Sequence, residues 1–392
     1  MDEVGVEQIR RFRLHSHHLD MAYPLTDAVG AAGACGLQNS PPKAWETALY
    51  NRVPSCDAAE LDRLLLRDKE LVQAWSFRGA PIVFPVRDAA SFLTALVPQG
   101  DEPWIYTRGI TLALDHLQMR FDELFELLLR VMPNLDECTI ASKTALDQTL
   151  ASWVAPLLPA DTRKRWNDPS MYGSPDTQTV GGAAVSFLLR PCSFCGLVVF
   201  GKREGASPTF TSYKHWLGSE LCAGDDAAKL LARAFLHCYG PTTPDAFASW
   251  LGCSGKQARR MWATVAEETK PVGVRGKKAF ILAADREALF APASLKRELL
   301  LLGPHDPYLD QRDRAILQPD TSLHTRIWKT VANPGALVHR GEVVGVWTSK
   351  AKAKGIEVTV SAWGDRFDER DLTCLIEEYA AFRGRELLGI RR

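Results

Sequence analysis

Residues 243–282, TPDAFASWLGCSGKQARRMWATVAEETKPVGVRGKKAFIL, carry the pattern that decides the fold. Thr243 can cap a helix whose first residue is Pro244, and Gly252 can end it. Ser254 then has capping-box spacing to Gln257, at the start of a second helix with an apolar side made of Ala258, Met261, Trp262 and Val265. Strands at 272–274 and 279–282 follow, joined by a basic turn. Two helices and a β-hairpin in this order predict a winged helix-turn-helix unit.

The same plan recurs nearer the N-terminus. Helices are expected near residues 23–37, 42–52 and 57–67, and a hairpin is expected from strands 71–76 and 81–85. Its turn, Phe77-Arg78-Gly79-Ala80, would place Arg78 at the tip or just inside it. This predicts a first module over residues 1–100.

A less regular copy occupies residues 101–225. Apolar stripes at 121–131 and 146–154 predict two amphipathic helices, and 156–182 is expected to be a long ordered loop, with Gly181-Gly182 leading into a strand. Strands at 196–200 and 209–213 would form a hairpin with a basic tip that contains Lys202 and Arg203.

The remaining chain divides into a third module, residues 226–300, and a C-terminal element, residues 301–392. For the C-terminal element we expect strands at 335–339, 343–347 and 356–363 and a helix at 369–383. The fold class is therefore mixed α and β, mainly helical, with tandem winged helix-turn-helix modules and a small antiparallel β element.

Charge and hydropathy exclude several classes of protein. Lys plus Arg equal Asp plus Glu at 47 each, so attraction to nucleic acid must come from local basic surface rather than net charge. The chain has no apolar run long enough to span a bilayer, and its start, Met1-Asp2-Glu3-Val4, lacks the basic and apolar regions of a signal peptide. We expect a cytoplasmic protein without membrane contact.

Cysteine and histidine spacing predicts no cofactor and no metal. Nine scattered cysteines are typical of reduced thiols rather than a disulfide framework. Cys192 and Cys195 have metal or redox spacing but no second such pair, and in a strand they would point to opposite faces. The pair His17-His18 is expected to be solvated.

Gly36-Leu37-Gln38-Asn39-Ser40-Pro41-Pro42 is the candidate active site. The two prolines force the chain out of helix, and Pro42 can open the next helix, so Gln38 would lie at a rigid helix terminus. The alternative is that Gln38 and Ser40 only cap helix ends. Sequence physics by itself favours capping.

A resemblance alters that balance. Several dispersed motifs follow one another along the chain: Gly36-Leu37-Gln38, Leu71–Trp75, Phe77-Arg78-Gly79, Tyr239–Pro244, Asp306–Leu309, Arg312-Asp313-Arg314, Arg326-Ile327-Trp328 and Gly341–Trp347. This is the order found in winged-helix DNA glycosylases of the AlkZ and YcaQ type, which this chain resembles over nearly its whole length. The catalytic motif of that family is a glutamine, one intervening residue, and then a glutamine or aspartate. The resemblance therefore implies Gln38 and Ser40 as the catalytic positions, with Ser40 departing from the pattern.

The chemistry that the resemblance implies is hydrolysis of an N-glycosidic bond. Positive charge builds on the sugar, so a catalyst must place a water and stabilise the sugar cation. An N-alkylated purine leaves as a neutral base and needs little protonation, so a neutral amide such as Gln38 can suffice. Without a carboxylate at position 40, unmodified bases should be poor substrates.

Basic and aromatic side chains near the predicted modules are the candidates for DNA contact. They are Lys43, Trp45, Arg78, Lys202, Arg203, Lys256, Arg259, Arg260 and Arg312. Trp45 and Trp75 would stack on a displaced base, although core packing is the commoner fate of tryptophan. The stretch 306–314 would form either an ion-pair lattice, which alternating signs favour, or a DNA-facing edge with Arg312 on phosphate.

These inferences predict a monomeric DNA repair glycosylase that acts on alkylated or bulky-adducted purines in double-stranded DNA. Two alternatives stay open. One is a non-catalytic DNA-binding protein of the same fold. The other is a regulator that uses Lys256, Arg259 and Arg260 as a recognition face.

Overall fold

The structure, a computed structural model, describes residues 1–173, 175–205, 207–310, 313–329, 331–364 and 366–392. The first part of the chain contains α1 (Val6–Ser16), α2 (Ala28–Gly33), β1 (Leu37–Gln38), α3 (Ala44–Arg52), α4 (Ala58–Asp62), β2 (Leu71–Trp75), β3 (Pro81–Pro85) and α5 (Ala89–Phe92). The middle part contains α6 (Thr111–Leu117), α7 (Phe121–Val131), β4 (Ile140–Ala141), α8 (Lys143–Val154), α9 (Ala160–Trp166), α10 (Val180–Phe194), β5 (Val199–Phe200), β6 (Thr209–Thr211) and α11 (Tyr213–Leu217).

The rest of the chain begins with a mainly helical part and ends with a part that contains most of its strands. A helical stretch with one hairpin comprises α12 (Ala227–Tyr239), α13 (Pro244–Leu251), α14 (Gly255–Ala263), β7 (Thr269–Val274), β8 (Lys277–Leu282) and α15 (Arg286–Phe290). The C-terminal part comprises β9 (Leu299–Leu302), α16 (Arg314–Leu317), α17 (His324–Ile327), β10 (Gly335–His339), β11 (Glu342–Ala351), β12 (Ile356–Ala362), α18 (Glu369–Phe382) and β13 (Leu387–Arg391). The chain is therefore mixed α and β, as predicted.

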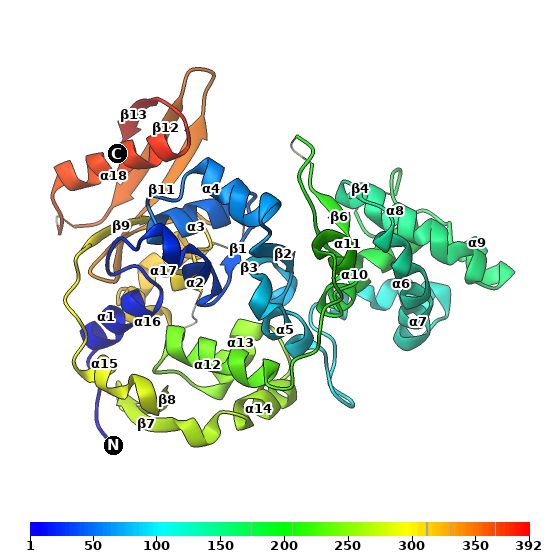
Figure 1. Ribbon diagram of the computed structural model, residues 1–392, viewed down its shortest axis with the longest axis horizontal. Helices are drawn as coiled ribbons and strands as arrows, with labels where there is room; N and C mark the ends of the chain where they lie inside the picture. The colour runs from blue at the N-terminus through cyan, green and yellow to red at the C-terminus, as the bar shows by residue number, and fades with distance from the viewer. Residues whose placement is uncertain (174, 206, 311–312, 330, 365) are drawn as a thin grey trace.

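A six-stranded sheet joins the first two predicted modules. Within the described residues its order is β1-β3-β2-β5-β6-β4, and Gln73 on β2 pairs with Phe200 on β5. The ring of Trp75 stacks on Phe210 across this junction, at 5.3 Å between centroids. In Figure 1 the helices α6 to α10 form a lobe together with β4, β6 and α11, and α1 to α5 and α12 to α18 lie on the other side of the junction. The division into four domains stays a prediction.

The stretch 243–282 forms the two helices and hairpin that its sequence predicts. The Thr243 hydroxyl accepts a hydrogen bond from the Ala246 amide, and Gly252 ends α13 with φ at 72°. The Ser254 side chain accepts a hydrogen bond from the backbone amide of Gln257, but the side-chain amide nitrogen of Gln257 donates to the Leu96 carbonyl at 3.0 Å. The cap is therefore one-sided, and its glutamine fastens α14 to the segment after α5.

A five-stranded sheet forms most of the C-terminal part. Its order within the described residues is β13-β12-β11-β10-β9, and the three sequence-predicted strands are β10, β11 and β12. The β12–β13 pair is parallel, while the other pairs are antiparallel. Helix α18 covers one face, where Tyr379 meets Trp347 edge-on at 4.8 Å between ring centroids.

Three sequence-based expectations about local structure are wrong. Residues 23–37 do not form one helix, because only 28–33 are α-helical and the chain enters strand β1 at Leu37. The expected loop 156–182 contains α9, and the residues after Gly182 lie in α10 instead of a strand. His17 is fully buried rather than solvated, and its ring packs edge-on against Tyr239 and Tyr308.

Among the described residues, no helix combines the length and apolar character that crossing a bilayer requires.

Candidate active site

Gln38 is positioned by a short strand and not by a helix terminus. Leu37 and Gln38 pair with Val83 and Ile82 of β3. Gly36 makes this entry possible, since it has φ at 73° and an added Cβ would lie 2.6 Å from a methyl group of Ile82. The prediction of a rigid corner holds, but the rigidity comes from the sheet.

Asn39, the middle residue of the motif, locks the corner from the side opposite Gln38. Its amide nitrogen donates to Gln73 Oε1 at 2.8 Å, and its Oδ1 accepts from the Lys43 backbone amide at 2.6 Å. Alternation along the extended chain then directs Gln38 away from these contacts. The amide of Gln38 is nearly buried and its Nε2 donates to the Ser40 carbonyl at 3.3 Å.

Arg78 enters the same site from the turn between β2 and β3. Arg78 and Gly79 both have positive φ, which lets the chain reverse here. The ring of Phe77 stacks on Trp250 at 4.2 Å, and Arg78 Nη1 donates to the Trp250 carbonyl at 2.8 Å. A cation at the C-terminal end of α13 is favoured by the helix dipole. The guanidinium is thus held in place before any ligand binds.

Asp310 completes the cluster from the other end of the chain. Arg78 Nη2 donates to Asp310 Oδ2 at 2.8 Å and to Gln38 Oε1 at 3.3 Å. The turn before Asp310 is pinned, because the Tyr308 hydroxyl donates to the Gly341 carbonyl and the Tyr239 hydroxyl donates to the Pro307 carbonyl. Burial raises the pKa of Asp310, while Arg78 acts in the opposite direction.

These three side chains line one pocket of about 520 Å³. The other lining residues are Ala80, Ser249, His305, Leu309, Arg314, Ile327, Trp328, Lys329, Asn333 and Pro334. Burial also lowers the pKa of His305, so its imidazole is neutral at pH 7. The pocket therefore combines a neutral amide, a carboxylate and cationic groups beside apolar walls, which suits a polar ligand with an aromatic part.

Ser40 does not join this cluster. It is exposed and is not among the residues that line the pocket, although its carbonyl accepts from Gln38. Gln38 and Ser40, which the sequence predicts as a catalytic pair, are thus in contact through the backbone carbonyl of Ser40 and not through its hydroxyl.

Comparison with known proteins decides the family. The model of the AlkZ-like DNA glycosylase family, described as "DNA glycosylase AlkZ-like", matches residues 31–382. This chain belongs to that family.

A curated relative and a solved structure agree with the assignment. The AlkZ-like chain is 25% identical over 337 residues to a protein of Streptomyces sahachiroi named "Interstrand DNA cross-link repair glycosylase", with 82% of this chain and 81% of the relative covered. Its fold is similar to that of the Streptomyces sahachiroi DNA glycosylase AlkZ, with a TM-score of 0.77, 21% identity and 99% of each chain covered.

The AlkZ-like fold buries both tryptophans that we expected to contact a displaced base. Trp45 is 4% exposed and packs in the core beside Leu49 and Val83. Trp75 is equally buried. The expectation that these rings stack on a base is wrong in this conformation, because each ring is buried in a hydrophobic core.

The predicted recognition face on α14 is largely neutralised. Arg260 makes a bidentate pair with the nearly buried Glu102, with both distances at 2.9 Å, and Lys256 pairs with Asp101. Arg259 is exposed. Asp101 and Glu102, from the segment after α5, thus form ion pairs with two of the three basic residues that a regulator of this kind would present to DNA.

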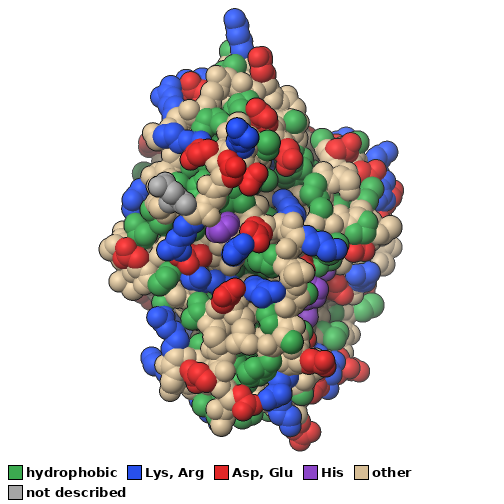
Figure 2. Space-filling view, turned by 90° about the vertical axis from the view of Figure 1, so that its left-hand side faces the viewer, with side chains coloured by type: hydrophobic (Ala, Val, Ile, Leu, Met, Phe, Trp, Pro, Cys, Tyr) green, Lys and Arg blue, Asp and Glu red, His purple; other side chains and the backbone are tan. Residues whose placement is uncertain are grey.

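The hairpin β5–β6 and Lys43 retain exposed positive charge. Lys202 is exposed on the loop after β5 and Arg203 is half-buried there; the loop projects from the body in Figure 1. Lys43 is exposed, with its amine 4.0 Å from Glu46. Figure 2 shows Lys and Arg side chains interspersed with Asp and Glu over the face that it presents. Arg312, the remaining candidate, lies outside the described residues.

The alternating signs of the stretch 306–314 predict a lattice of local ion pairs. Its described aspartates do not pair locally, however: Asp306 pairs with Arg52, Asp310 with Arg78 and Asp313 with Arg13. Each arginine comes from the first part of the chain. The stretch is therefore clamped to the elements that carry Gln38.

Cys192 and Cys195, which have metal or redox spacing but were not expected to bind metal, are not where the structure gathers metal-ligating atoms. Cys192 is buried inside α10 and Cys195 follows it at the helix end, so the pair is not in a strand, and burial raises the pKa of Cys195 to about 11. In the part of the chain that the structure describes, His17, Cys35 and Cys238 form a buried soft-donor cluster with ligand atoms within 4.8 Å of one another. Hydrogen bonding to Cys35 and burial raise the pKa of Cys238, which favours the protonated thiol of that residue.

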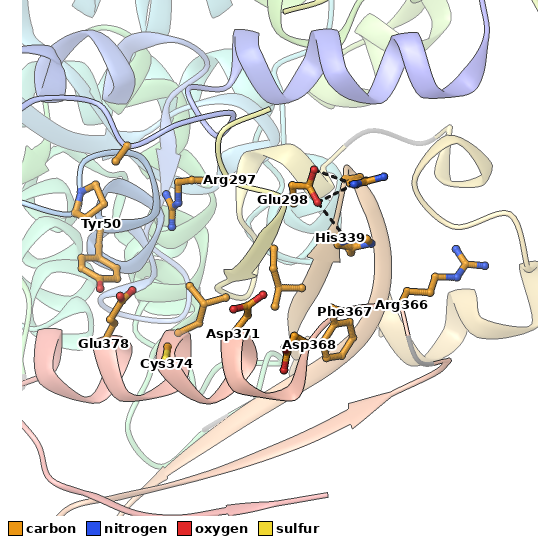
Figure 3. Close-up of a pocket in the computed structure, with 15 residues that line it drawn as sticks. Tyr50, Arg297, Glu298, His339, Arg366, Phe367, Asp368, Asp371, Cys374 and Glu378 are labelled. Atoms are coloured by element: carbon orange, nitrogen blue, oxygen red, sulfur yellow. Dashed lines mark hydrogen bonds and ion pairs between the residues drawn. The ribbon is translucent and has the colours of Figure 1, made fainter. Parts of the chain in front are cut away.

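A larger pocket, of about 890 Å³, lies away from Gln38. In Figure 3 its walls come from α18, with Asp371, Cys374 and Glu378, and from the opposite side, where Glu298 holds His339 and Arg340. None of the sequence-predicted site residues lines it. We place the candidate active site at the smaller pocket, because the catalytic position of the family motif opens there.

Proposed function

We propose that this protein is a monofunctional DNA glycosylase that hydrolyses the N-glycosidic bond of alkylated or bulky-adducted purines in duplex DNA. One observation carries the proposal: Gln38, which matches the first catalytic position of the family motif, presents its amide to a pocket beside the anchored Arg78. The name of the curated relative supports testing cross-linked purines as well. We also propose that α12–α14 with β7–β8, and the hairpin β5–β6, act as winged-helix modules that grip the duplex.

In this mechanism Gln38 orients the attacking water. An amide oxygen accepts from water and the amide nitrogen donates to it, but neither removes a proton at neutral pH. Arg78 fixes the amide by donating to its Oε1, which leaves the second lone pair of that oxygen for water. The departing N-alkylated purine needs no protonation, so the site requires no strong acid. We also propose that the protein acts as a monomer in the cytoplasm.

The rival function is DNA binding without catalysis, and the serine at position 40 favours it. The regulator hypothesis has less support, since Asp101 and Glu102 neutralise much of the α14 face.

The deciding experiment incubates the protein with duplex DNA that contains a methylated purine and counts abasic sites. Gln38→Ala should preserve folding and DNA affinity and lower base release by roughly 10²-fold, the usual scale for a positioned catalytic group. Ser40→Ala should be milder, because the hydroxyl is exposed. If the wild type releases no base from any N-alkylated or cross-linked duplex, the rival function replaces this one.

A further inference from the structure

We propose that Asp310 is the catalytic carboxylate of this site, and that it supplies the negative charge that position 40 lacks. The inference rests on the proposed glycosylase function and deepens it. Asp310 is 272 residues away from Gln38 along the chain, and no spacing in the sequence connects the two.

Geometry brings the two groups together. Gln38 Oε1 and Asp310 Oδ2 accept from the same nitrogen of Arg78, at 3.3 and 2.8 Å. Two oxygens that share one donor are close enough for a single water to contact both. Both side chains line the same pocket, and that of Asp310 keeps 15% exposure. A water there would touch an amide that orients it and a carboxylate that can take its proton.

The reaction step balances with these groups. The water oxygen forms a bond to the sugar C1′ as the bond from C1′ to the purine nitrogen breaks. The electron pair of the broken bond leaves with the purine, so a cationic N-alkylated base departs neutral. The proton lost by the water passes to the carboxylate of Asp310. Before that transfer, the negative charge of the carboxylate stabilises the developing sugar cation.

The electrostatic surroundings suit a base. Arg78 and His305 act to lower the pKa of Asp310, Asp306 acts to raise it, and Arg314 and Lys329 are among the other residues that line the pocket. Burial is the largest influence on the Asp310 pKa and raises it above the ordinary 3.8. A raised pKa makes a carboxylate a better proton acceptor. Since the base must be ionised, base release should fall as pH drops through a value above 3.8.

A purely structural role as the partner of Arg78 makes a different prediction. In Asp310→Asn the amide oxygen can still accept from Arg78, so the fold and the position of Arg78 should be kept while the charge is removed. A structural partner would then leave the rate and its pH profile nearly unchanged.

The test measures single-turnover base release from a duplex with one N-methylated purine, over about pH 5 to 8, corrected for release without protein. Asp310→Asn should lose roughly 10²-fold in rate and lose the acidic limb of the profile. Asp225→Asn, an exposed aspartate outside the pocket lining, is the matched control and should retain both.

Wild-type rate and an intact acidic limb in Asp310→Asn would overturn the inference. If Gln38→Ala still loses activity in that case, the proposed function survives; if the wild type releases no base, both fall. Should Asp310→Asn not fold, Arg78→Gln provides the second test. Removing that positive charge must move the acidic limb to higher pH, and an unmoved limb would count against Asp310.

Discussion

The buried pair of Arg52 and Asp306 should dominate the stability of the region that carries the site. The two side chains are 1% and 0% exposed, and they form two parallel hydrogen bonds at 2.9 and 3.0 Å. Asp306 also accepts from the Tyr308 amide, and Arg52 donates to the Ala48 carbonyl. The carboxylate and the guanidinium are thus both committed to partners inside the protein.

Asp306→Ala removes one partner and leaves the Arg52 guanidinium buried without its counter-charge. Loss of one member of such a pair costs about 3–5 kcal/mol, because burying an unpaired charge is far less favourable than burying a pair. The entropy of unfolding is about 2.1 cal/mol/K per residue, so in a chain of 392 residues each kcal/mol lowers Tm by about 1.2 °C, and we expect a fall of roughly 4–6 °C.

Urea unfolding followed by circular dichroism measures the free energy of unfolding directly. Glu220→Ala, which breaks an exposed pair with Lys214, is the control and should cost no more than about 1 kcal/mol. Replacing both partners, as Arg52→Met with Asp306→Leu, should be less damaging than Asp306→Ala because no charge is left unpaired. A loss below about 1 kcal/mol in Asp306→Ala, similar to that of the control, would refute the reasoning.

Three further predictions concern binding, pH and metal. Replacing Lys202 and Arg203 together by alanine should weaken DNA binding. The slope of log affinity against log salt should become shallower by about 0.9 for each phosphate that the protein no longer neutralises. An unchanged slope would place the DNA elsewhere on the surface. Burial lowers the pKa of His18 from 6.5 to about 4, so the unfolded chain binds the extra proton first, and stability should fall as pH drops from 6.5 towards 4. Thermal melts of wild type and His18→Gln check this, and an equal fall in the variant would contradict it. A chelator should leave Tm unchanged, because the raised pKa of Cys238 favours its protonated thiol, which needs no metal ion. Stoichiometric metal in the purified protein would contradict this prediction.

Local signals predict local structure well in this chain. Thr243, Pro244 and Gly252 each act within four residues along the chain, and α13 begins and ends where they indicate. Strands β2 and β3 and helix α18 likewise follow from short-range alternation and periodicity. By contrast, the apolar stripe predicts a helix through Gly36, because periodicity does not reveal that Ile82 leaves no room beside it.

The site requires information that the sequence does not carry locally. Gln38 is found through the family motif, but its contacts come from Arg78 and Asp310, at distances along the chain that no spacing rule covers. Trp45 illustrates the opposite failure. Its position beside the motif suggests base stacking, and only its burial in a core with Leu49 of the same helix and Val83 of β3 shows that the ring is inaccessible.

The clamping of the 306–313 stretch by arginines from the first part of the chain has a consequence for biosynthesis. A nascent chain that has emerged through β3 already contains Gln38 and Arg78, yet it lacks the carboxyl group that Arg78 binds and the lining residues of the pocket that lie between His305 and Pro334 in the sequence. The pocket can close only after translation has passed those residues. Until then a ribosome-bound fragment contains the motif without the pocket around it. Hydrolytic activity against the genome should therefore begin only once the chain is almost completely translated.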